Sequence, residues 1–243
     1  MWRILNSLIS PKIFYQLASF TLPWLTALFL IFFSYGLIGG LLLAPADYQQ
    51  GDGFRIIYIH VPSAFLSLFI YSVMAGAAFT ALVWRIKMAY LVIRHSAPIG
   101  ALFTFLALFT GSLWGKPMWG TYWIWDARLT SELILLFLYL GIMLFQSAMQ
   151  QKHSGNRAVA ILILVGFVDL PIIHYSVYWW NTLHQGATLK LLGPSAIDSS
   201  MVYPLLSMIL AFMAYYGMIL FMKLRYELIT ANANHHWLRG ASS

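Results

Sequence analysis

Long, nearly uninterrupted runs of apolar residues dominate the chain and are separated by short polar segments. Six such runs can be read, covering about residues 20–43, 57–84, 97–113, 129–149, 158–175 and 202–224. Each approaches the roughly 20 residues that a helix needs to cross a bilayer. The runs are continuous rather than alternating, and lipid offers no partner to bare backbone, which favours helices over strands. The pattern predicts an all-α integral membrane protein, with one domain over residues 1–243 built as a six-transmembrane-helix bundle.

Composition supports a membrane protein over a water-soluble helical one. The chain is 61% hydrophobic and 9% charged, whereas soluble domains carry about 25% charged residues. The first run is longer than the apolar core of a secretory signal, and no small-residue cleavage site closes it, so we expect it to remain as a span. The chain contains no cysteine, which excludes disulfides, thiolate metal ligands and covalent haem attachment through a C-x-x-C-H motif.

Basic residues predict the orientation. The two tails and the segments after the second and fourth runs carry ten Lys and Arg residues, whereas the other side carries Arg55, Lys116, Arg128 and Lys190. Since Lys and Arg concentrate on the cytoplasmic side, both termini are expected to be cytoplasmic. Segments 44–56, 114–128 and 176–203 then face outward, which is the periplasm for a bacterial inner membrane protein. The scattered basic residues favour the lipid bilayer over nucleic acid as a partner.

Loop length predicts where the chemistry takes place. The cytoplasmic connections, 85–96 and 150–157, are short, and the outward segments are longer. Functional residues concentrate on such loops, so we expect the functional site on the outer face.

The densest candidate chemistry lies in segment 114–128. It contains four tryptophans followed by an acid and a base: Trp114, Trp119, Trp123, Trp125, Asp126 and Arg128. Membrane proteins place Trp at interfaces in any case, but this density predicts a platform for a large, flat, apolar ligand. We expect a compact, turn-rich segment on the membrane surface, with Asp126 as the N-cap of the next helix. Arg128 and Glu132 have the spacing of an ion pair on that helix.

Histidines near the outer face flank this segment. His60 ends the second run on the outer side, and His184 lies in the third outward segment. Neutral imidazole is a good ligand for haem iron, so the two could hold a porphyrin between them. His174 is a rival that spacing does not exclude, and a hydrogen-bonded interfacial histidine is the alternative for each. By charge and side, Arg55 and Arg128 are candidate contacts for haem propionates.

An acid and a proline interrupt the fifth run. Asp169 is an intramembrane carboxyl, which indicates either a functional group or a structural hydrogen bond. Pro171 is expected to kink the helix at this point, because it lacks an N–H group.

Residues 119–130, Trp-Gly-Thr-Tyr-Trp-Ile-Trp-Asp-Ala-Arg-Leu-Thr, resemble the tryptophan-rich WWD signature of haem-handling proteins of c-type cytochrome biogenesis. The chain length, the six runs, and the histidines at positions 60 and 184 extend the resemblance over essentially the whole chain. In these features the chain resembles the haem exporter protein C (CcmC) family. Larger WWD proteins, which ligate haem to apocytochrome, have more spans than this chain can hold.

The resemblance implies a carrier that binds haem b non-covalently at the periplasmic face and delivers it to a membrane-anchored haem chaperone. It implies partners from an ABC transporter, namely ATPase and permease subunits, and a small single-span membrane subunit. It implies His60 and His184 as axial ligands, with contacts to haem and chaperone from Trp114, Trp119, Trp123, Trp125 and Asp126. Two other readings remain open: a permease subunit that itself translocates haem or another small molecule, and a haem-dependent quinol oxidoreductase.

Overall fold

A computed structural model of the chain describes residues 11–149, 153–184 and 197–231, and these ranges contain helices and no strand. The elements are α2 Pro11–Leu37, η1 Ile38–Leu43, η2 Asp52–Ile56, α3 Ile57–Trp84, α4 Lys87–Trp119, α5 Ala127–Ala148, α6 His153–Gly166, α7 Asp169–Trp179 and α8 Ser199–Ala231. Six helical stretches in the described part are long and apolar enough to cross a membrane. The predicted all-α, six-helix membrane bundle is therefore confirmed.

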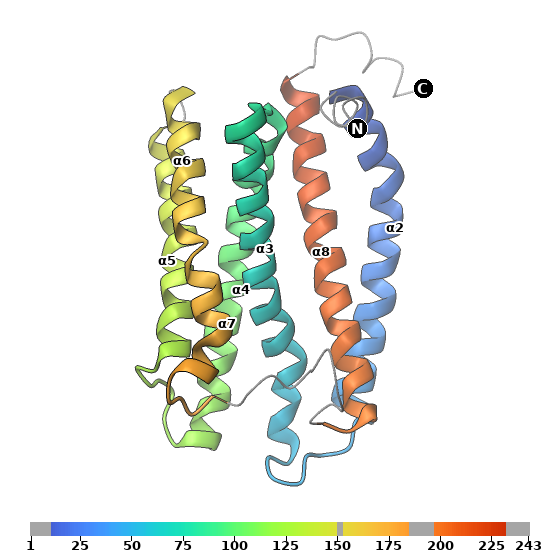
Figure 1. The fold of residues 1–243 in the computed structure, drawn as a ribbon. Coiled ribbons are helices and arrows are strands. Elements are labelled where there is room, and N and C mark those ends of the chain that lie inside the picture. Colours follow the sequence, from blue (N-terminus) through green and yellow to red (C-terminus); the bar gives the residue numbers. More distant parts are fainter. Residues whose placement is uncertain (1–10, 150–152, 185–196, 232–243) are drawn as a thin grey trace.

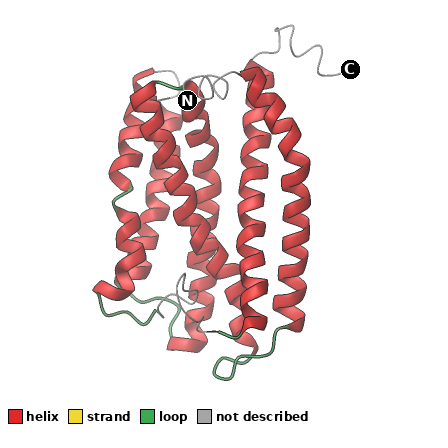
Figure 2. Cartoon of the chain, turned by 45° about the vertical axis from the view of Figure 1, so that its right-hand side comes forward, coloured by secondary structure: helices red, strands yellow, loops and turns green. Residues whose placement is uncertain are grey.

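The helices run side by side along one axis (Figure 1). Helix α3 packs most extensively on α4, and α2 packs on α8, which also contacts α3. Figure 2 shows that the longer loops gather at one end of the bundle. We call this the tryptophan end, because it carries residues 44–56 and 120–126. The first described turn of α2 and the last of α8 lie at the opposite end (Figure 1).

Helix α4 is longer than its apolar run predicts. The run covered 97–113, and 85–96 was expected to be a loop; this expectation is wrong, because α4 begins at Lys87. Only Arg85 and Ile86 separate it from α3, and Arg85 takes a left-handed φ of 55°. The added turns bury Ala89 and Ile93 against the bundle. Packing therefore stabilises these turns as helix, although their charged residues interrupt the apolar run in the sequence. With 33 residues, α4 is about 50 Å long and exceeds the hydrocarbon thickness.

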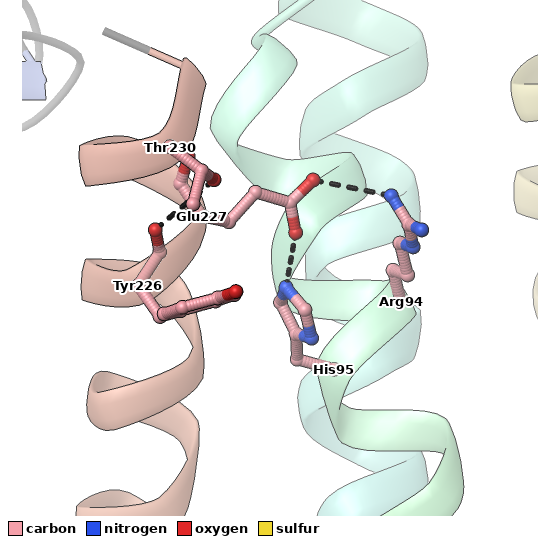
Figure 3. Close-up of polar contacts among 5 residues, drawn as sticks. All are labelled: Arg94, His95, Tyr226, Glu227 and Thr230. Carbon is pink, nitrogen blue, oxygen red and sulfur yellow. Dashed lines mark hydrogen bonds and ion pairs between the residues drawn. The ribbon is translucent and has the colours of Figure 1, made fainter. Parts of the chain in front are cut away.

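A polar cluster joins α4 to α8 at the end opposite the tryptophan end (Figure 3). The Glu227 carboxylate accepts a hydrogen bond from Nη1 of Arg94 at 3.1 Å and pairs with the His95 ring. Partly exposed ion pairs of this kind contribute about 0–1 kcal/mol. The cluster therefore sets the relative position of the two helices more than it stabilises them.

The fifth span breaks between α6 and α7, as the proline predicted. Pro171 cannot donate to the carbonyl of Phe167, which instead accepts from the Leu170 N–H at 3.2 Å. Residues 167 and 168 leave the helix. Helix α6, which precedes the break, packs on α3 and α5, whereas α7, which follows it, packs mainly on α5. The break therefore takes the second half of this span away from α3.

Candidate functional site

A cavity of about 300 Å³ lies at the tryptophan end, lined by side chains from α3, α4, α5, α7 and α8. This is within the range of small-molecule sites. Its polar and aromatic lining includes Gln50, His60, Trp114, Trp119, Arg128, His174 and His184. The fold thus brings together all three histidines that the sequence placed near the outer face.

His60 is buried on α3 and faces α4. Its Nδ1 lies 3.0 Å from the carbonyl oxygen of Ala107 and 3.1 Å from the hydroxyl of Thr110. A carbonyl only accepts hydrogen bonds, so Nδ1 carries a proton, and in the neutral ring Nε2 is the nitrogen with a free lone pair. Glycine at position 111 makes room for the ring, because a Cβ there would lie 2.9 Å from Cε1 of His60. The ring is therefore oriented to act as a ligand through Nε2.

His184 follows α7 and is held by a short chain of hydrogen bonds. Its backbone N–H donates to the hydroxyl oxygen of Thr182 at 3.1 Å, and that hydroxyl donates to Oδ2 of Asp126. The other carboxylate oxygen, Oδ1, accepts from the Leu129 N–H at 2.8 Å. The prediction that Asp126 is an N-cap is therefore confirmed. One carboxylate fixes both the start of α5 and, through Thr182, the segment that carries His184.

The two imidazoles have the separation expected of ligands to one metal. Their ring centres are 6.2 Å apart. Two imidazoles on one metal stand roughly 6 Å apart between ring centres, since each nitrogen is about 2 Å from the metal. Nδ1 of His184 is buried and has no hydrogen-bond partner among the described residues. Buried polar atoms are normally satisfied, so the donor set fits a metal-centred ligand such as haem.

The environment of His184 keeps its ring neutral. Burial, with a further contribution from the Arg128 charge, lowers the pKa of His184 to about 4, and the Asp126 charge opposes this shift only in part. At neutral pH the ring is therefore unprotonated, which is the form that binds a metal.

Two of the four tryptophans face the histidines from α4. The Trp114 ring centre is 5.6 Å from that of His60, and Trp119 is 5.4 Å from His184. Both belong to the last turns of α4. The prediction of a turn-rich surface segment beginning at residue 114 is therefore wrong for residues 114–119. The helix ends at Gly120, whose left-handed φ of 77° and N–H bond to the Lys116 carbonyl form a C-cap.

The other two tryptophans lie in the non-helical stretch 120–126. Their ring centres are 5.4 Å apart, and neither belongs to the described lining of the cavity. Trp125 is 76% exposed, and Nε1 of Trp123 is buried without a partner among the described residues. The predicted platform is therefore divided: Trp114 and Trp119 lie at the cavity, and Trp123 and Trp125 lie outside it.

The two candidate arginines differ in position. Arg128 lines the cavity, and its Nη1 donates to the Ile173 carbonyl at 3.0 Å. It forms no ion pair with Glu132, which instead accepts a hydrogen bond from Ser67 at 2.7 Å; the predicted pair is wrong.

Arg55 forms its hydrogen bonds within the segment around residues 40–55. It bonds Asp52 at 3.0 Å and the carbonyls of Gly40 and Ala44 at 2.7 and 3.0 Å, and it is not among the described residues that line the cavity. Its guanidinium anchors segment 44–56 to the end of η1, so this structure does not bring Arg55 to the histidines.

A family model described as "Heme exporter protein C" matches residues 4–239. The chain belongs to the heme exporter protein C family. It is 49% identical to "Heme exporter protein C" of Escherichia coli (strain K12) over 238 residues, which cover 98% of the chain and 96% of the relative. For the protein of that name from Haemophilus influenzae the identity is 48% over 239 residues, with 98% and 97% covered. A ccmC-like mitochondrial protein of Marchantia polymorpha, named for cytochrome c biosynthesis, is 45% identical over 183 residues, covering 75% and 77%.

In this member of the family, three residues at the site were missed by sequence reasoning. Thr182 links Asp126 to His184, Gly111 admits the His60 ring, and Gln50 accepts from Trp114 Nε1 at 2.8 Å. Only Thr182 had a local signal, because a threonine two residues before a histidine can accept from its backbone N–H. Asp169 is buried with Oδ2 unpartnered among the described residues, and it lies outside the cavity lining.

Proposed function

We propose that the chain binds haem b non-covalently at the periplasmic face of the bacterial inner membrane and delivers it to a membrane-anchored haem chaperone. The names of its relatives support haem delivery for cytochrome c maturation. The observation that carries the proposal is the pair His60 and His184, with ring centres 6.2 Å apart on one cavity. Nδ1 of His60 faces the Ala107 carbonyl, which leaves Nε2 as the nitrogen for a metal, the His184 ring is neutral at neutral pH, and two indoles pack beside them.

Each side chain at the cavity has a role in this proposal. His60 and His184 bind the iron from separate segments, and Trp114 and Trp119 contact the macrocycle, whose burial supplies non-directional affinity. Arg128 lines the same cavity, and its guanidinium suits a propionate carboxylate. Trp123, Trp125 and Asp126 lie outside the cavity lining, and we assign the contact with the chaperone to them. Trp125 is the exposed residue of the three, at 76%.

Delivery requires that at least one bond from histidine to iron is lost. We propose that ATPase and permease subunits of an ABC transporter, with a small single-span subunit, favour the releasing state by binding it more tightly than the loaded state. The chain breaks no bond within its cargo, so it acts as a carrier and not as an enzyme.

The decisive experiment loads the purified full-length chain with haem in detergent and then adds the soluble domain of the chaperone. We expect a six-coordinate, low-spin absorption spectrum that is lost as the chaperone acquires haem. Absence of the six-coordinate spectrum would overturn the ligand assignment. A loaded chain that transfers nothing to the chaperone, but moves haem across sealed vesicles, would favour the permease alternative.

Thr182→Val is expected to accelerate haem release, because valine keeps the shape of threonine and removes both hydrogen bonds that hold the His184 segment. A hydrogen bond to a charged group contributes about 1.5–3 kcal/mol, so the dissociation rate should rise by roughly tenfold or more. The rate is measured by transfer to an excess of a haem-scavenging protein. Thr182→Ser is the matched control and should release haem at nearly the wild-type rate. Equal rates for the valine and serine variants would show that the hydroxyl is not needed.

Acidification is expected to release haem only far below the ordinary histidine pKa of about 6.5. The folded-state pKa of His184 is lowered to about 4, so the neutral ligand form persists as the pH falls and is lost as the pH approaches that value. Absorbance should therefore stay constant from pH 8 to pH 5.5, roughly one unit below the ordinary value. Haem bound to free imidazole in detergent is the control and should lose its ligands near the ordinary pKa. A midpoint near that value in the protein would contradict the role of burial.

A further inference from the structure

The cavity continues beyond the histidines along α3. Its lining includes Ala64, Phe65 and Leu68, which follow His60 toward the middle of the span Asp52–Trp84. Leu68 is eight positions after His60 in the sequence, so the lining extends about 12 Å into the bundle at 1.5 Å per residue. The ligand space therefore reaches membrane depth and is not confined to the surface.

The lining changes from polar to apolar along this path. At the tryptophan end it includes His60, His184 and Arg128, whereas the deeper part is formed by Leu68, Phe65 and, from α8, Ile209. Such a gradient matches a ligand with carboxylates on one edge and an apolar macrocycle on the rest.

Among the described residues, the break in the fifth span leaves this deeper part without a covering helix on one side. Helix α6 packs on α3, but α7 packs mainly on α5 (Figure 1). Within the part of the chain that the structure describes, α3 therefore presents a free face between α7 and α8. Phe65 on that face is 42% exposed, and Tyr178 on α7, which also lines the cavity, is 66% exposed. At the tryptophan end, by contrast, the Trp114–Gln50 hydrogen bond and the Trp119–His184 ring contact join side chains of the lining to one another.

We propose that this free face is a lateral groove through which haem passes from the surrounding lipid to His60 and His184. The groove is formed by Ala64, Phe65, Leu68, Val177, Tyr178 and Ile209. It is part of the histidine cavity, its walls come from the membrane-spanning helices α3, α7 and α8, and its polar end holds the Arg128 guanidinium. The macrocycle therefore enters from the bilayer, with its propionate edge toward the tryptophan end. This inference rests on the function proposed above.

The test measures how fast the protein loads. The full-length chain is reconstituted in vesicles, haem is supplied either within the bilayer or in water on a carrier protein, and formation of the six-coordinate spectrum is followed in time. With wild-type protein we expect the rate to follow the mole fraction of haem in the lipid. Ile209→Trp, which fills the groove from α8, should slow loading by at least roughly tenfold, equivalent to about 1.4 kcal/mol in barrier height. Val177→Trp, from α7, should do the same.

Leu210→Trp is the matched control. Leu210 is the neighbour of Ile209 on α8, is 45% exposed and is not part of the described lining, so its replacement should leave the rate unchanged. Leu210→Trp should reach the wild-type spectrum at saturation. Because Val177 and Ile209 line the ligand cavity, the loading rate of each groove variant is normalised to its own final six-coordinate absorbance, which separates slow entry from weaker binding. A wild-type rate that follows aqueous haem, or groove variants that load as fast as the control, would overturn the lateral route. Failure of wild-type protein to form the spectrum from either source would instead overturn the proposed function.

Discussion

His60→Ala and His184→Ala are each expected to abolish the six-coordinate haem spectrum and to weaken haem binding severely. Removing a residue that only orients a metal ligand typically costs roughly 10–100-fold in affinity, and loss of the ligand itself should cost more. The spectra of the purified variants and haem titrations measure both effects. Added imidazole should restore the six-coordinate spectrum of each variant, because the truncated side chain leaves space beside the iron.

His174→Ala is the control for this prediction. His174 lines the same cavity from α7 and makes an edge contact with Tyr175, with ring centres 4.8 Å apart. It has no ring contact with either proposed ligand among those described. Its replacement should leave the spectrum unchanged. If it alone removes the six-coordinate spectrum, the ligand pair has been assigned wrongly.

Asp126→Ala is expected to lower the stability of the protein and to accelerate haem release together. The substitution removes the N-cap of α5, which typically costs about 0.5–2 kcal/mol, and it also removes the acceptor of the Thr182 hydroxyl. Thermal unfolding in detergent reports the first effect, and the haem dissociation rate reports the second. Asp126→Asn should retain most of the stability, because asparagine caps helices about as well as aspartate.

The double variant Asp126→Ala with Thr182→Val tests whether the two residues act as one unit. If Asp126 influences His184 through Thr182, the double variant should release haem at a rate close to that of Asp126→Ala alone. Fully additive effects on the rate would show that the carboxylate and the hydroxyl act independently.

Features with local causes were predictable from the sequence. The six spans follow from apolar runs, the start of α5 from the capping preference of Asp126, and the break before α7 from the missing N–H group of Pro171. Each of these signals lies within a few residues of the feature that it determines, so a single sequence is enough to read it.

Features with tertiary causes were not predictable. The first turns of α4 are helical because Ala89 and Ile93 pack on the bundle, although their neighbours are charged. Gly111 leaves space for the ring of His60, which lies 51 positions earlier in the chain. Arg55 donates its hydrogen bonds to carbonyls of the segment before it and does not reach the histidines. The tryptophans were divided between cavity and surface because α4 continues to Trp119 and ends at Gly120, which the density of indoles did not reveal.

Helix α4 connects the two faces of the membrane as one mechanical element. The same helix supplies Arg94 and His95 to the cluster with Glu227 at one end, and the carbonyl of Ala107 to the His60 ring nearer the other. It stays helical over these positions, with Pro98 between them, so a shift of the whole helix along its axis by the rise of one residue, about 1.5 Å, moves the carbonyl by a similar amount. A 3.0 Å hydrogen bond does not survive such a displacement unchanged. A subunit that binds the far end of this helix can therefore disturb His60, the proposed iron ligand, without contacting the side of the membrane on which His60 lies.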